Sequence, residues 1–153
     1  MTVRGTKLKM VIYYLVKKLG NRLTKTKLMK LLFISDYIAK EGKKSGIGRT
    51  ITGAQYIYYH YGPFSFEVYP AINEMNGYEI LEFDSSESSR YGSLFSYEVG
   101  ANPRFEIRLS DHEKKILDLV INKYGYMPLD DLLTMVYNSK PMINAKVNDI
   151  ILE

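Results

Sequence analysis

The chain has 153 residues, of which 46% are hydrophobic and 25% are charged, a composition typical of a soluble globular protein rather than of a disordered one. It contains no cysteine and only two histidines, which excludes disulfides, thiolate chemistry, iron–sulfur clusters, Cys-based zinc sites and a multi-histidine metal site within one chain. The net charge is +4, but it is distributed unevenly: residues 1–50 carry 13 basic and two acidic residues, whereas residues 51–153 carry 8 basic and 15 acidic residues. We therefore expect either an anionic partner on one face or simply a soluble lysine-rich surface.

The first predicted element is a helix over residues 6–19, where the apolar residues recur at helical spacing. Thr6 is placed to cap its start and Gly20 to end it. The longest apolar run near the N-terminus, residues 10–16, is too short to cross a bilayer, and no cleavage site of small residues follows it. We therefore expect a cytoplasmic protein with no membrane partner.

A second helix is predicted from Thr24 or Thr26 to about Lys40. Its apolar residues cover more than one face, so we expect it to be the central and most buried helix. Three glycines with intervening lysines, at 42, 46 and 48, then predict a loop.

The middle of the chain predicts a small sheet. Residues 55–61 predict a strand or a buried extended segment, ended by Gly62-Pro63. A short helix is expected over residues 65–76, which Pro70 either bends or truly begins. Further strands are predicted at 78–83, 94–99 and 104–109, the last two forming a hairpin, with a mobile polar loop at 84–93.

The last third of the chain predicts helices. Residues 110–113 predict a capping box at the start of a helix that ends at Gly125. The next helix is expected to begin at Pro128 and to end at Pro141. The tail at 147–152 fits a last helix or an edge strand. The predicted fold class is α+β and mostly helical, with helix–turn–helix units flanking a small antiparallel sheet or hairpin in a winged-helix-like order. We expect a single domain over residues 1–153.

The start of the predicted helix at 24–40 carries an unusual set of cations. A helix N-terminus favours acids, as Asp130 and Asp131 illustrate in the later helix, and disfavours lysines. A bound anion, such as a phosphate or a carboxylate, would explain the cations, and side chains extended into water are the alternative. The predicted anion or nucleic-acid site consists of Arg22, Lys25, Lys27 and Lys30.

Residues 56–69 are rich in aromatic side chains, eight of fourteen when His60 is counted. Such rings either pack in the core or anchor a partner, whereas the lack of basic residues among them disfavours binding to single-stranded nucleic acid. His60 fits a packed histidine better than a catalyst. The predicted partner-binding residues are Tyr58, Tyr61, Phe64 and Phe66.

Two segments together resemble the Panacea domain family of SocA-like antitoxins and phage-associated proteins: TKLMKLLFISDY at 26–37 and YGPFSFEVY at 61–69. The resemblance covers about residues 24–145. The chain departs from the family pattern by the extra helix at about 6–19 and by the absence of tryptophan from the aromatic segment. The residues that carry the family motif are Leu28, Lys30, Leu31, Tyr61, Gly62, Pro63 and Tyr69.

The resemblance implies a non-enzymatic protein, either an antitoxin that neutralises a toxin encoded nearby or an adaptor that delivers a toxin to a protease. The residues agree, because no nucleophile elbow, phosphate-binding loop or dinucleotide motif is present. We therefore expect no catalytic residue, cofactor or metal. Binding of a partner protein is the first hypothesis, a winged-helix-like DNA-binding regulator is the second, and an aromatic surface would also suit a homodimer.

Overall fold

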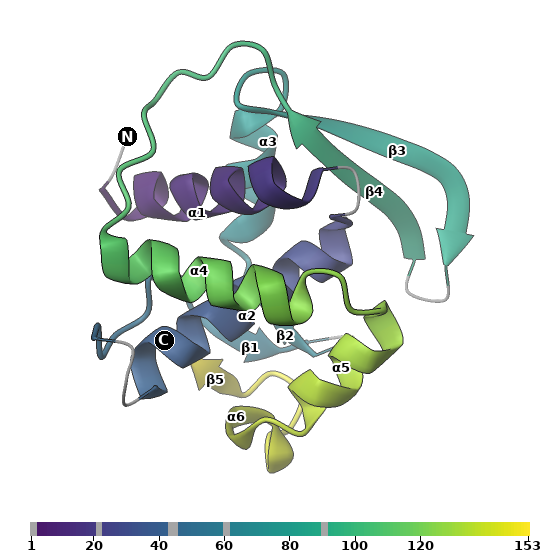
Figure 1. Ribbon diagram of the computed structural model, residues 1–153. Coiled ribbons are helices and arrows are strands. Elements are labelled where there is room, and N and C mark those ends of the chain that lie inside the picture. The colour runs from purple at the N-terminus through teal and green to yellow at the C-terminus, as the bar shows by residue number, and fades with distance from the viewer. Residues whose placement is uncertain (1–2, 21–22, 43–45, 60–61, 90–91) are drawn as a thin grey trace.

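The structure is a computed structural model, and it describes residues 3–20, 23–42, 46–59, 62–89 and 92–153. Within these residues the chain forms six helices and two small antiparallel sheets, which confirms the α+β, mostly helical class (Figure 1). None of the described helices has the length and apolarity that a membrane span needs.

Helix α2 (Lys25–Glu41) lies at the centre of the fold, as its apolar pattern predicts. All ten of its residues from 27 to 36 are buried, and it contacts α1 (Val3–Leu19), two later helices and both sheets. Thr24 caps its start by accepting a hydrogen bond from the backbone N–H of Lys27. The predicted cap at Thr6 is wrong, because α1 already begins at Val3 and Thr6 lies inside it.

One buried carboxylate attaches the segment after α2 to that helix. Asp36 Oδ1 accepts hydrogen bonds from the backbone N–H groups of Ile51 at 2.7 Å and Thr52 at 3.0 Å. Its Oδ2 accepts from the hydroxyls of Thr52 at 2.5 Å and Tyr56 at 2.7 Å. Burial raises the pKa of Asp36, and these four hydrogen bonds lower it in turn. Because all four partners are donors, the site suits an ionised carboxylate.

The first sheet has the strand order β2-β1-β5 and lies on α2. Its strands are β1 (Tyr56–Tyr58), β2 (Pro63–Phe64) and β5 (Ile150–Leu152), all antiparallel. The apolar tail is therefore an edge strand and not a helix. This sheet joins residues that are almost a hundred positions apart in the chain.

Helix α3 (Val68–Met75) is shorter than the helix predicted over residues 65–76. Pro70 lies in its first turn, where a missing backbone N–H removes no helical hydrogen bond, so the proline marks the true start of the helix and does not bend it. Its buried residues are Val68, Ala71, Ile72 and Met75.

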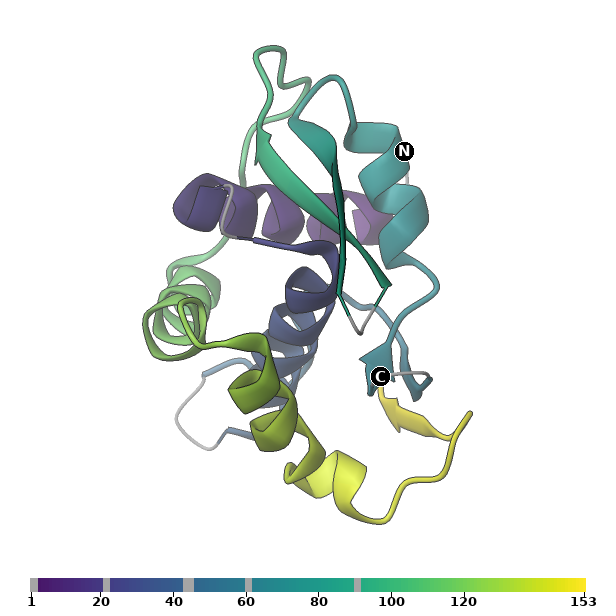
Figure 2. The same ribbon diagram turned by 90° about the vertical axis from the view of Figure 1, so that its right-hand side faces the viewer.

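The second sheet is a long hairpin of β3 (Ile80–Ser89) and β4 (Gly92–Val99), which passes across α1 in the view of Figure 2 and projects to one side of the molecule in that of Figure 1. The polar loop expected at 84–93 is wrong, because its described residues belong to β3 and β4, whose pairing has an irregularity between Asp84 and Ser88. Serines favour turns by their local chemistry, but here the cross-strand partners outweigh that preference.

The strand predicted at 104–109 is also wrong, because β4 pairs with β3 and residues 104–109 pair with no strand in the described part of the chain. They contact α1 as irregular chain with a bend at Phe105. Phe105 packs edge-on against Tyr13, and the backbone N–H of Arg108 donates to Met10 Sδ at 3.4 Å. Their alternating apolar residues therefore reflect packing on a helix and not pairing in a sheet.

Helices α4 (Asp111–Tyr124), α5 (Leu129–Tyr137) and α6 (Lys140–Ile143) complete the fold. The capping box is confirmed, since Ser110 and Glu113 exchange side-chain-to-backbone hydrogen bonds at 2.8 and 3.1 Å, and Gly125 caps the end of α4. The prediction that Pro141 ends the next helix is wrong, because α5 ends at Tyr137 and the proline lies in the first turn of α6.

The Asp36 network makes a testable contribution to stability. We expect Tyr56→Phe to lower the free energy of unfolding by about 1.5–3 kcal/mol, because the lost hydrogen bond goes to a buried, charged acceptor. Urea unfolding at pH 7 measures the change. The control is Tyr13→Phe in a half-buried tyrosine of α1, expected to stay within about 0.5 kcal/mol of the unsubstituted protein. A loss no larger than that of the control would show that the hydrogen bond is dispensable.

Candidate partner-docking surface

The aromatic segment contributes to both faces of the first sheet. Tyr56 is completely buried against Phe33 of α2, and Tyr58 contacts Tyr137 of α5 with 6.0 Å between the ring centroids. Because side chains alternate along a strand, Ile57 and Tyr59 point to the opposite face. The sequence alone left open whether this segment is core or surface, and the structure shows that it is both.

Four rings form a cluster on that outer face. Phe64 lies 5.0–5.2 Å from the ring centroids of Tyr59, Phe66 and Tyr69, and Tyr59 lies 5.5 Å from Phe66. Pairs with this geometry contribute roughly 0.5–1.5 kcal/mol each beyond the area that they bury. The four rings thus stabilise one another's positions, although 62% of the surface of Phe66 is open to solvent.

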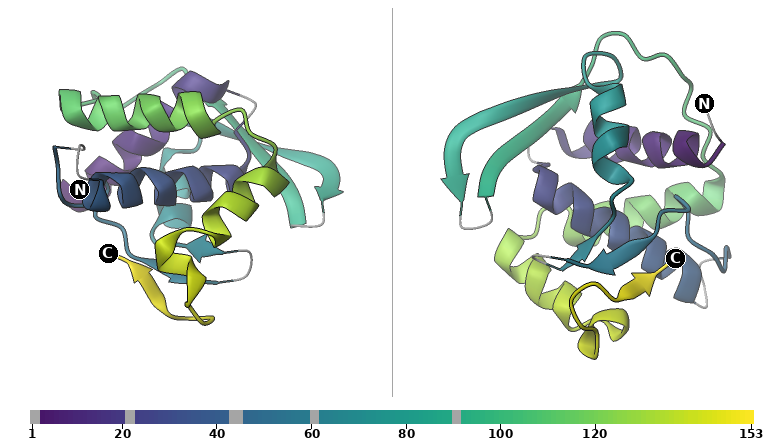
Figure 3. Two further views of the ribbon diagram at one scale, coloured as in Figure 1. Left: turned by 60° about the horizontal axis from the view of Figure 1, so that its bottom comes forward. Right: turned by 180° about the vertical axis from the view of Figure 1, so that it is seen from behind.

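The apolar surface continues across the sheet. Ile57 is paired with Phe64 on one side and with Ile150 on the other, and directly opposed residues share a face. Ile150 is 57% exposed. We call the whole surface the sheet-face patch, and no described helix covers it when the molecule is seen from behind (Figure 3, right). Its members are Ile57, Tyr59, Phe64, Phe66, Tyr69 and Ile150.

The predicted partner-binding residues are distributed unevenly over the structure. Phe64 and Phe66 lie in the sheet-face patch, Tyr58 points toward α5, and Tyr61, like His60, lies outside the described residues. The sequence interpretation missed Ile57 and Ile150. The alternation around Ile57 is a local signal that could have identified it, whereas nothing local indicates that Ile150 lies beside it.

The predicted cationic site is also divided. Arg22 lies outside the described residues. Lys25 borders the sheet-face patch, with its ammonium nitrogen 4.1 Å from the ring centroid of Tyr69 and 3.8 Å from Glu82 Oε2. Lys27 is buried, and burial lowers its pKa. Of the four predicted cations, Lys25 is therefore the one that the structure places at the edge of the patch.

Lys30 is buried to 3% exposure beneath the sheet. Its ammonium donates a hydrogen bond of 2.9 Å to the carbonyl oxygen of Pro63, and burial lowers its pKa from 10.5 to about 8. The lysine of the first family motif therefore binds the Gly-Pro turn of the second motif.

That turn depends on its glycine. Gly62 adopts a φ of 113°, a backbone conformation that is unfavourable for any residue with a side chain.

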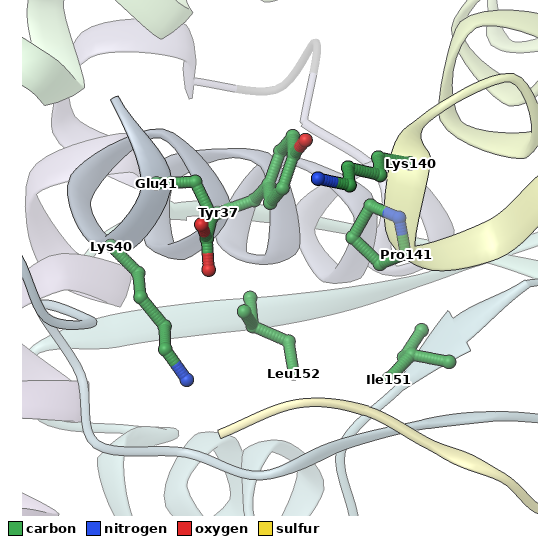
Figure 4. A pocket seen from close by; sticks show the side chains of 7 residues that line it. All are labelled: Tyr37, Lys40, Glu41, Lys140, Pro141, Ile151 and Leu152. Atoms are coloured by element: carbon green, nitrogen blue, oxygen red, sulfur yellow. The ribbon is translucent and has the colours of Figure 1, made fainter. Parts of the chain in front are cut away.

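A cavity of about 330 Å³ lies beneath β5 (Figure 4). The ammonium of Lys40 at its rim donates to the backbone carbonyl of Glu153 at 2.5 Å. Among the described residues, no group of three or more His, Cys, Asp or Glu could hold a metal ion here or elsewhere. The cavity is lined by Tyr37, Lys40, Glu41, Lys140, Pro141, Ile151 and Leu152.

Comparison with known proteins gives one match. The model of the family described as antitoxin SocA-like, Panacea domain, matches residues 28–141 of the chain. Comparison with curated proteins and with solved structures gives no match. The matched region begins in α2 and ends in α6, and it contains every member of the sheet-face patch except Ile150.

The buried lysine predicts an unusual dependence of stability on pH. A lowered pKa means that the unfolded chain binds more protons than the folded protein between about pH 8 and 10.5, so this group makes stability rise with pH in that window. Between pH 7 and pH 9.5, the free energy of unfolding of the unsubstituted protein should rise by about 2 kcal/mol more than that of Lys30→Met. Urea unfolding at both pH values measures the difference. The control is Lys123→Met on the surface of α4, and an equal pH dependence in both variants would refute the assignment.

Proposed function

Because the chain belongs to the SocA-like antitoxin family through its Panacea domain, we propose that it binds a partner protein, namely a toxin encoded nearby, and holds it inactive. The role is regulatory and non-enzymatic. The observation that carries the proposal is the sheet-face patch, where a cluster of four packed rings ends in the exposed ring of Phe66.

The patch has the properties of a protein interface. Tyrosine and phenylalanine bury a large apolar area at a low cost in side-chain entropy, and they are enriched among the residues that contribute most to binding. A preformed cluster loses little freedom when a partner covers it. Isolated exposed apolar residues are ordinary on proteins, but a contiguous patch is typical of an interaction site.

Neutralisation would proceed by occlusion. The partner's working surface would pack on Phe64 and Phe66, and Lys25 at the edge of the patch would attract acidic groups and orient the encounter. Lys25 already pairs with Glu82, so its charge would contribute mainly to specificity. The four rings would contribute most of the affinity.

DNA binding with a winged-helix-like geometry is the second candidate. The excess of basic residues in the first fifty positions and the helix pair α1–α2 favour it. The burial of Lys27 and Lys30 weakens it, since buried ammonium groups do not contact phosphates. A mobility-shift assay at low salt separates the two candidates. Binding that falls steeply as salt is added would support the regulator, and absence of binding would remove it.

The patch predicts the effect of a single surface substitution. Phe66→Ser should weaken binding to the purified product of the neighbouring gene by tenfold or more, because it removes the most exposed ring of the cluster. Isothermal titration calorimetry measures the affinity, and rescue of growth in cells that express the toxin measures the function.

The matched control is Phe83→Ser in β3, since Phe83 is also exposed but is not a member of the patch. Both variants should remain folded, as circular dichroism can check, because both rings are exposed. Phe66→Ser should lower the melting temperature, since it also loses the ring contacts to Tyr59 and Phe64. If the unsubstituted chain does not bind the neighbouring product, the proposed function is wrong. If both substitutions weaken binding equally, the patch is not the interface.

A further inference from the structure

The two edges of the first sheet differ in what they offer to another strand. An edge strand normally presents unpaired N–H and C=O groups to which a further strand can bind. Along β2 these groups are already used. Pro63 has no N–H, its carbonyl accepts from Lys30, and the backbone N–H of Ser65 donates to Met29 Sδ at 3.4 Å. Helix α2 therefore closes the β2 edge with its own side chains.

The β5 edge has no such closure. Among the described residues β5 has β1 on one side and no strand on the other. Between β1 and the start of β5, the backbone N–H of Tyr58 donates to the carbonyl of Asp149, and the carbonyl of Tyr58 accepts from the N–H of Asn148. Ile57, the neighbour of Tyr58, is opposite Ile150, and in an antiparallel ladder the direction of the backbone groups alternates. The N–H and C=O of Ile150 therefore point to the open side.

The cavity beneath β5 adds side-chain recognition to this edge. Alternate side chains of a strand added beside β5 would point to the same side as the cavity, where Tyr37, Pro141 and Ile151 form an apolar wall (Figure 4). Lys140 extends toward the cavity from α6, and Lys40 lies on the other side. With Glu41 as the one acid in the lining, two cations against one anion favour an acidic group in the occupant.

We propose that the partner protein adds an extended segment to the open edge of β5, with an apolar side chain in the cavity and an acidic side chain at Lys140. This rests on the proposed function, and it specifies how the same partner is held. The sheet-face patch extends to Ile150, so a partner that covers the patch arrives at this edge. Main-chain hydrogen bonds would supply affinity here, and the cavity would supply sequence preference.

Two substitutions at this edge test the proposal against the purified product of the neighbouring gene. Ile150→Pro removes the backbone N–H that a partner strand would bind, but it also removes a side chain of the sheet-face patch. Ile150→Ala, which shortens the same side chain and keeps the N–H, measures the second effect by itself. Lys140→Glu reverses a charge at the cavity, and Lys115→Glu reverses an exposed lysine on α4 as its control. In calorimetric titrations we expect Ile150→Pro to bind at least tenfold more weakly than Ile150→Ala. Lys140→Glu should weaken binding at least tenfold, and Lys115→Glu should stay within threefold of the unsubstituted protein.

Amide hydrogen exchange measured by NMR provides a readout that does not depend on a variant. The N–H of Ile150 should exchange at least tenfold more slowly in the complex than in the free protein. Unchanged exchange, together with full affinity in Lys140→Glu, would overturn the proposal even if Ile150→Pro fails to fold.

The outcomes separate the two proposals. Loss of binding in Phe66→Ser with retained binding in Ile150→Pro and Lys140→Glu would leave the proposed function standing and reject strand addition. No binding by the unsubstituted chain would reject both. If light scattering shows a dimer of this chain and Ile150 is protected in that dimer, the edge belongs to a second copy and the proposal is wrong.

Discussion

One buried carboxylate attaches the first strand of the first sheet to the central helix. Asp36 on the central helix accepts four hydrogen bonds from the segment that leads into β1, and no other acid is buried within α2. An unpaired carboxylate in this place would cost several kcal/mol, so the helix and the segment are stable only together. Tyr56, held by this network, sets which side of β1 faces the core. The outward direction of Ile57 and Tyr59 follows from that.

The same helix determines which sheet edge stays open. Lys30 lies three residues from Phe33, on a stretch of α2 that is otherwise apolar. Burying its charge costs free energy, whereas burying a methionine at the same position would not. Its hydrogen bond to Pro63 closes the β2 edge against other chains. A sheet of three short strands with two open edges would invite non-specific association. Closing one edge from within leaves a single direction in which a partner can extend it.

The cations of the first half of the chain have several roles. Lys7 pairs with Glu113 near the start of α4, Lys9 with Glu74 of α3, and Lys25 with Glu82 of the hairpin. These contacts join the basic first half to the acidic second half, which accounts for part of the charge asymmetry within the fold itself. An anionic partner is thus one of two explanations for the asymmetry, and the sheet-face patch is a more direct indication of a binding surface than the charge count.

Local chemistry determined most of the helices. Periodic apolar residues, the cap at Thr24 and the capping box at Ser110 act over a few residues, and the family motifs are equally local. The errors at 84–93 and 104–109 arose because a strand needs a partner that its own sequence does not identify. Only the tertiary structure could bring Ile150 beside Ile57, bury Lys30 against Pro63 and divide the tyrosines between core and surface. Each of these features depends on contacts between residues that are distant in the sequence. Such contacts form, and stabilise the protein, only when the chain folds.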